Sequence, residues 1–277
     1  MSIKIRDLSF SYGTRRCDGS GRGREPYDVL RRIDLDLPDG CLVNVLGPNG
    51  AGKSTLFRCI LCLEEGYTGS IEIDGLDLRR MSVRERAKRI AFIPQAHESV
   101  YDYSVLDVVL MSAASSTGVV GAPRAEHVER AWGALERVGI ARLAHRPATQ
   151  ISGGEQQLVL IARALAQNAR TIIMDEPTSA LDYGNTMRVL SCVRQLAREG
   201  LSIVQSTHQP DQAFLFADKV LAISKGRVRA FGDPRDVITE DLVAELYGVD
   251  VSICSLFGDR MRVCVPSREI DMAGRDA

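Results

Sequence analysis

Apolar and polar residues alternate along this chain with two different periods. Short β-branched runs predict buried strands, and longer stretches with apolar residues three or four positions apart predict helices. The predicted buried strands cover residues 41–46, 89–93, 171–174 and 202–206. The predicted helices cover 53–63, 104–112, 124–138 and 153–167. Because helical stretches separate the strands, we expect an α/β fold with a largely parallel core sheet.

The length, net charge and apolar runs of the sequence limit the class of protein. The chain has 277 residues, enough for one large domain or for one domain with an inserted lobe. Its net charge of −1 is no basis for expecting nucleic acid as a partner. The sequence lacks an apolar run of eighteen residues, and its first thirteen residues alternate like a strand and lack the apolar centre of a signal peptide. We therefore expect a protein that stays in the cytoplasm.

Seven cysteines are spread along the chain without a regular framework. Cys59 and Cys62 form a CxxC, which allows a metal or redox interpretation. This pair lies on the apolar helix predicted at 53–63, and no second pair stands at metal-ligand spacing. We expect two buried small side chains.

Polar groups follow each of the four predicted buried strands. In parallel sheets ligands bind outside the carboxyl ends of the strands, so these four groups are expected at one edge. They are the stretch 47–55, then Pro94 and Gln95, then Asp175 and Glu176, then Thr207 and His208.

The first group is a phosphate-binding loop of the form GxxxxGKS between a strand and a helix. Its glycines let backbone N–H groups turn toward phosphates, and the helix N-terminus adds a favourable dipole. We expect Lys53 to reach the β- and γ-phosphates and the Ser54 hydroxyl to bind Mg²⁺; the alternative is a chance glycine turn. The predicted ATP-binding residues of this loop are Gly47, Pro48, Asn49, Gly50, Ala51, Gly52, Lys53, Ser54 and Thr55.

The third group consists of two carboxylates, Asp175 and Glu176, which follow an apolar strand. Asp175 suits the second coordination shell of Mg²⁺, and Glu176 suits a general base that orients and deprotonates a water. The alternative is helix capping by acidic residues. Gln95 and His208 gain importance only because they follow strands of the same sheet, from which each could reach a γ-phosphate or its water.

These motifs, together with ISGGEQQ at 151–157 and SALD at 179–182, resemble the ATP-binding subunits of ABC transporters in order and spacing. The resemblance covers nearly the whole chain. It implies a RecA-like phosphate-loop NTPase core with a mainly parallel sheet, an N-terminal antiparallel β-part and an inserted α-helical lobe. The core would comprise 1–95 and 166–277, and the lobe 96–165.

The resemblance also explains the glycines of ISGGEQQ. Ser152 and Glu155 are spaced as a capping box, but this does not account for Gly153 and Gly154 in the first turn of a helix. In the family this signature stretch contacts the γ-phosphate of ATP held by a second copy. A head-to-tail homodimer is thus implied, with Asp182 lining the same interface.

Further roles follow from the resemblance. Tyr12 matches the aromatic residue that stacks on adenine, although the insert 14–26 departs from the usual compact connection. Gln95 would sense the γ-phosphate, and His208 would hold it. Mg²⁺ would be held by Ser54, Gln95 and Asp175.

The segment 96–111 and the stretches LDYGN, HQPDQAFLFADKVLAI and LYGVDV resemble the importers of metal chelates, that is, siderophore-iron, haem or cobalamin. The implied partners are integral-membrane permease subunits, docked at 96–111, and indirectly an extracytoplasmic binding protein. The chain would then lie on the cytoplasmic face of the inner membrane. After Met111, Ser112 and Ala113 replace the family's usual Gly-Arg.

The alternatives are four other classes of protein. A soluble ABC ATPase of iron–sulfur assembly and the separate ATPase subunit of an exporter both remain open. DNA-repair relatives carry a long coiled coil, for which the spacing from Gly47 to Asp175 leaves no room. A binding module without catalysis would lack Glu176 or His208, and both are present.

Overall fold

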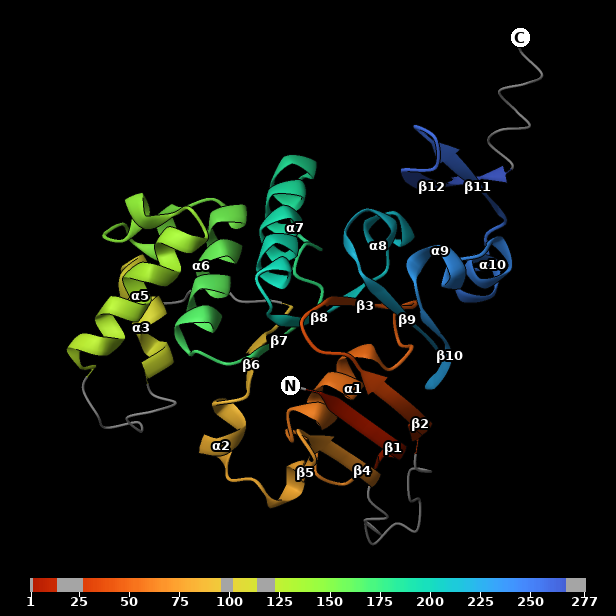
Figure 1. Ribbon diagram of the computed structural model, residues 1–277, viewed down its shortest axis with the longest axis horizontal. Helices are drawn as coiled ribbons and strands as arrows, with labels where there is room; N and C mark the ends of the chain where they lie inside the picture. The colour runs from red at the N-terminus through yellow and green to blue at the C-terminus, as the bar shows by residue number, and fades with distance from the viewer. Residues whose placement is uncertain (1, 14–26, 96–101, 114–122, 268–277) are drawn as a thin grey trace, which may run out of the picture. The chain divides into compact units, whose positions relative to one another are not determined.

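The computed structural model describes residues 2–13, 27–95, 102–113 and 123–267. The insert at 14–26 and the first part of the predicted docking segment, residues 96–101, lie outside these ranges. Contacts divide the chain into two compact units, residues 80–205 and residues 2–79 with 206–277 (Figure 1). The predicted boundaries of the helical lobe at 96 and 165 stay a prediction.

The unit of residues 80–205 combines helices with parallel strands. β7 pairs in parallel with β6 on one side and with β8 on the other. The helices α3, α5 and α6 pack against one another. Its elements are α2 (Val83–Ala87), β6 (Ile90–Ile93), α3 (Val105–Leu110), α5 (Ala125–Arg137), α6 (Gly153–Ala166), β7 (Thr171–Met174), α7 (Tyr183–Arg198) and the first four residues of β8 (Ser202–Thr207), with short 3-10 turns at Met111–Ala113, Ala141–Leu143 and Ala148–Gln150. A further 3-10 turn, Leu78–Arg80, spans the boundary between the two units.

The unit of residues 2–79 and 206–277 carries an antiparallel sheet in the order β2-β1-β4-β5. In the same unit β3 pairs in parallel with β9, and β9 pairs with β10 in antiparallel register. Its elements are β1 (Ile3–Tyr12), β2 (Tyr27–Leu37), β3 (Leu42–Leu46), α1 (Lys53–Ile60), β4 (Thr68–Ile73), β5 (Leu76–Asp77), α8 (Pro210–Phe216), β9 (Lys219–Ser224), β10 (Arg227–Gly232), α9 (Pro234–Val237), α10 (Glu240–Tyr247), β11 (Val251–Leu256) and β12 (Met261–Pro266).

The strand pairings confirm the predicted α/β class, with a parallel core and an antiparallel N-terminal sheet. Every residue of β3, β7 and β8 is buried, although β8 contains the polar residues Ser202, Gln205, Ser206 and Thr207. The predicted helix at 53–63 was too long, because α1 ends at Ile60 and Cys62 adopts a left-handed φ of 55°. The N–H groups of Leu63 and Glu64 then donate to the Arg58 carbonyl.

Cys59 and Cys62 are both buried on this helix and its terminal turn. Burial raises the pKa of the Cys59 thiol to about 12. A buried thiol that stays protonated is a poor metal ligand and a poor nucleophile. The structure therefore supports the interpretation that the two cysteines of this CxxC are packing residues.

Candidate functional site

The phosphate loop joins β3 to α1 and has its lysine folded inward. Gly52 is the N-cap of α1 with a φ of 105°, a left-handed conformation that glycine adopts without steric cost. Lys53 is 5% exposed, and its Nζ donates to the carbonyls of Gly47 at 2.7 Å and Pro48 at 3.2 Å. The ammonium therefore lies within the loop, and the Ser54 side chain that follows it is exposed.

Two backbone hydrogen bonds connect this loop, through Gly226, to neighbouring segments. The Gly226 N–H donates to the Ala51 carbonyl at 3.0 Å, and the Arg31 N–H donates to the Gly226 carbonyl at 2.8 Å. The loop is thus connected through the β9–β10 turn to β2. Such a connection preorganises the loop before any ligand binds.

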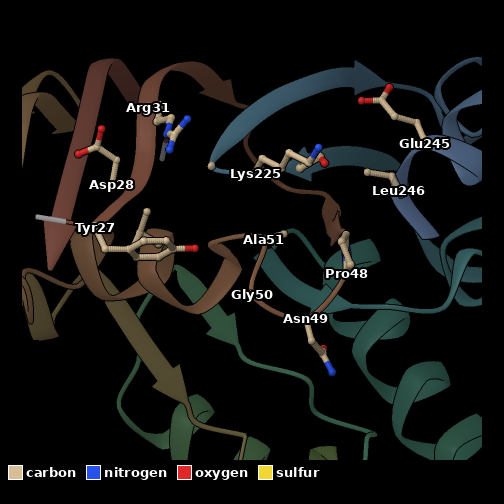
Figure 2. A pocket seen from close by; sticks show the side chains of 13 residues that line it. Tyr27, Asp28, Arg31, Pro48, Asn49, Gly50, Ala51, Lys225, Glu245 and Leu246 are labelled. Atoms are coloured by element: carbon tan, nitrogen blue, oxygen red, sulfur yellow. The ribbon is translucent and has the colours of Figure 1, made fainter. Parts of the chain in front are cut away.

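A recess of about 330 Å³ opens between these same three segments and α10 (Figure 2). Arg31 and Lys225 line it together with Asp28 and Glu245, so its charges are mixed. Asp28 accepts a hydrogen bond from Ser11, and Glu245 forms an ion pair with Arg229. Lys53 and Ser54 do not line this recess, which therefore borders the loop without including its phosphate-binding residues.

Tyr12 lies at the end of β1, in the same unit as the loop. Its ring is 38% exposed and meets Phe10 edge-on, with the ring centroids 4.8 Å apart. Its hydroxyl donates to Glu64 at 3.3 Å. Tyr12 is thus partly exposed at the surface of this unit, and its stacking on adenine stays a prediction.

His208 is exposed and follows β8 directly, two residues before α8 begins. It belongs to the unit that carries the phosphate loop. Strand β8 positions its backbone, as predicted.

In the other unit, Gln95 and Glu176 are in contact. They follow the parallel strands β6 and β7, and Gln95 Nε2 donates to Glu176 Oε2 at 3.2 Å. Glu176 has a φ of 45°, an unfavourable conformation for a residue with a side chain. Strain of this kind clusters at functional sites, and here it falls on the predicted general base.

Asp175 precedes Glu176 and is 7% exposed. Its N–H donates to the Ile93 carbonyl at 2.9 Å, which continues the pairing of β6 with β7. A buried carboxylate at a strand end, the Gln95 amide oxygen and the Ser54 hydroxyl are hard oxygen donors, the kind that Mg²⁺ prefers. Within the described residues, no group of three or more histidine, cysteine, aspartate or glutamate side chains is arranged so that it could hold a metal ion.

The capping box predicted at the start of α6 is present. Ser152 Oγ accepts from the Glu155 N–H at 3.3 Å, and Glu155 Oε2 accepts from the Ser152 N–H at 3.1 Å. This hydrogen bond from the Ser152 backbone holds the pKa of the Glu155 carboxyl below its usual value. Ser152 and Gly153 are exposed, so the N–H end of the helix is open to a ligand.

Gly154 is buried and has a packing role that the sequence did not reveal. A Cβ at this position would lie 2.2 Å from Asn185 Oδ1 and 2.7 Å from Asn185 Cβ. Asn185 cannot easily move, because its Nδ2 donates to Asp182 Oδ2 and its N–H to Asp182 Oδ1, each at 2.8 Å. Asp182, the N-cap of α7, therefore fixes the residue that fits against α6.

This packing predicts that replacement by alanine affects the stability of the protein differently at the two glycines. We expect Gly154→Ala to lower the free energy of unfolding by about 1–3 kcal/mol, the usual cost of overpacking. At Gly153 a Cβ would meet only Leu181 Cδ2 at 3.6 Å, so Gly153→Ala should change it by less than about 1 kcal/mol. Urea denaturation of both variants measures the difference. Equal stabilities would contradict the packing, whereas partial recovery in the pair Gly154→Ala, Asn185→Ala, which removes the Asn185 amide but keeps its Cβ, would support it.

The sequence profile of the family described as ABC transporter matches residues 30–179. The "Hemin import ATP-binding protein HmuV" of Rhodococcus jostii is 34% identical over 87% of this chain and 82% of its own length. A solved structure described as a metal-chelate type ABC transporter in an inward-facing conformation superposes with a TM-score of 0.81. It shares 31% identity and covers 97% of this chain and 98% of that one.

A bacterial ABC transporter cassette solved as a dimer also superposes, with a TM-score of 0.69 and 29% identity over 84% of this chain and 99% of that one. Within the described residues no helix is long and apolar enough to cross a membrane. The profile match spans more than half of the 277 residues. The chain therefore belongs to the ATP-binding subunits of ABC transporters, the ATPases that couple ATP hydrolysis to transport across membranes.

Proposed function

We propose that this chain is the ATP-hydrolysing subunit of an importer for a metal chelate of the siderophore-iron, haem or cobalamin type. The observation that carries the catalytic part is the hydrogen bond between Gln95 and the strained Glu176 at the ends of β6 and β7. The likeness to the hemin-import subunit and to the metal-chelate transporter supports the cargo class.

In this proposal the nucleotide is held by the phosphate loop, by Tyr12 and by residues at the strand ends. Lys53 leaves the carbonyls of its own loop to bind the β- and γ-phosphates, and Tyr12 stacks on adenine. Ser54, Gln95 and Asp175 would hold Mg²⁺, which neutralises developing charge on the phosphates when bound. Glu176 accepts a proton from the attacking water, and His208 donates a hydrogen bond to the γ-phosphate.

A second copy of the chain completes each site in this proposal. Ser152 and Gly153 present exposed polar groups at the start of α6, which suits a phosphate held by the partner. The dimeric cassette to which this chain is similar supports such an assembly. Closure of the homodimer on ATP and reopening after hydrolysis would drive the permease.

The proposed partners are integral-membrane permease subunits and, through them, an extracytoplasmic binding protein. The subunit would sit on the cytoplasmic face of the inner membrane. In the described part of the docking segment, Tyr103 is 45% and Met111 44% exposed. Exposed apolar side chains of this size suit burial against a partner helix.

This partnership predicts the result of a capture experiment. Tagged chain purified from detergent-solubilised native membranes should recover a stoichiometric polytopic membrane protein, identified by mass spectrometry. Met111→Arg should reduce this recovery on the order of 10-fold, because it buries an unpaired charge in the contact. Val83→Arg is the matched control, since Val83 is 73% exposed and lies outside the docking segment. Soluble partners alone would instead indicate an ATPase of cofactor assembly.

A further inference from the structure

The residues around His208 form a closed ring of hydrogen bonds. Thr207 Oγ1 donates to Gln212 Oε1 at 3.1 Å, and Gln212 Nε2 donates to Gln209 Oε1 at 2.8 Å. The Gln209 N–H then donates back to Thr207 Oγ1 at 3.1 Å. The ring therefore joins the two residues that flank His208 to each other and to the first turn of α8.

Two of the three members of the ring are buried, and the third, Gln209, is exposed. Thr207 and Gln212 are each 5% exposed, whereas His208 is exposed. The Gln212 amide uses its oxygen toward Thr207 and its nitrogen toward Gln209, so its orientation is set at both ends. Buried networks with every member satisfied are rigid, because each broken bond leaves a desolvated polar group.

A second contact ties the same turn to the C-terminal hairpin of β11 and β12. Asp211 Oδ1 accepts from the backbone N–H of Cys264 at 2.8 Å, and Cys264 lies on β12. The other edge of the hairpin is held similarly, since the Ile253 N–H donates to Glu240 Oε1 at 2.8 Å. Cys264 also packs against a core cluster that includes Ala213 of α8. The hairpin thus holds α8 by one side-chain hydrogen bond and by apolar contact.

We propose that Thr207 and Gln212 are positioning residues for His208, and that Asp211 anchors their ring to the C-terminal hairpin. This inference rests on the proposed role of His208 at the γ-phosphate. An imidazole on an exposed turn keeps one direction only if its backbone cannot rotate, and the ring restrains the backbone on both sides of it.

The test compares two isosteric changes in the full-length protein. Thr207→Val keeps the side-chain shape and removes the hydroxyl, so it breaks two of the three bonds of the ring. We expect kcat for ATP hydrolysis to fall about 10-fold with KM for ATP changed less than about 2-fold. Thr207→Ser keeps the hydroxyl and should retain the wild-type rate.

A double-mutant cycle separates positioning from general stability. If Thr207 acts through His208, then Thr207→Val should lower kcat less than about 2-fold in a His208→Ala background. A full 10-fold loss in both backgrounds would overturn the positioning role while leaving His208 at the site. Wild-type turnover of His208→Ala alone would instead remove His208 from the proposed mechanism, and the positioning role would fall with it.

Two variants of Asp211, one to asparagine and one to alanine, give an independent measurement if Thr207→Val folds poorly. Asp211→Asn keeps an acceptor oxygen for the Cys264 N–H and should behave as wild type. Asp211→Ala removes it and should lower kcat about 3-fold with an unchanged KM, again only where His208 is present. Equal kcat values for the two variants would show that the hairpin does not act on this turn.

Discussion

Replacing Glu176 by glutamine is expected to lower ATP turnover on the order of 10²-fold or more while ATP binding is kept. The amide has the shape of the carboxylate and can still accept the hydrogen bond from Gln95, so the local structure should persist. What is lost is the group that takes a proton from water. Steady-state phosphate release gives the turnover, and nucleotide binding at equilibrium gives the affinity.

The control for this experiment is Glu129→Gln, which removes the same charge from an exposed position on α5. This variant should hydrolyse ATP at the wild-type rate. Turnover of Glu176→Gln near the wild-type rate would exclude Glu176 as the general base. Loss of nucleotide binding in Glu176→Gln would point to a structural role for the strained residue at the end of β7.

Replacing Ser152 by arginine is expected to leave nucleotide binding by the monomer intact and to prevent ATP-dependent dimerisation. A bulky side chain at the exposed start of α6 would occupy the place proposed for the partner's γ-phosphate. Turnover should then fall on the order of 10²-fold, comparable to the loss of a preorganised hydrogen-bond donor to the reacting group. Light scattering with ATP and a hydrolysis-deficient background measures the dimer.

The chain supplies a matched control for the loss of the helix cap itself. Ser82 begins α2 with the same φ of −65° and ψ of 157° as Ser152, and it forms the same capping box, with Glu85. Ser82→Arg should therefore cost a similar amount of helix stability, about 1 kcal/mol, without affecting dimerisation. If Ser152→Arg abolished nucleotide binding in the monomer, the assignment of this stretch to a partner's site would be wrong.

Short sequence patterns predicted most helices and strands, because residues close together in the sequence determine where these elements form. The strands β3 and β7 are buried on both faces, and a strand of that kind is marked by a mainly apolar run that is visible in the sequence. The capping box at Ser152 involves residues three positions apart, so its geometry follows from spacing alone. Errors fell on helix ends, as at Ile60, where the termination of α1 depends on a left-handed turn at Cys62.

Contacts between distant segments could not be predicted in the same way. Nothing in SGGEQQ indicates that Gly154 must leave room for Asn185, thirty-one positions later, and the glycine pair suggested only an open phosphate site. The strain at Glu176 and its bond to Gln95 depend on β6 and β7 lying side by side. The ring around His208 involves a glutamine that no motif distinguishes from its neighbours.

The order of the motifs in one chain was sufficient to identify the family, the phosphate loop and the residue types available for chemistry. These depend on short spacings along the backbone, which one-dimensional patterns record directly. The tertiary structure decided which of those residues touch, which glycine is needed for packing, and how the turn bearing His208 is held. Those properties depend on close packing and on the direction of buried hydrogen bonds, and both arise only when segments far apart in sequence meet.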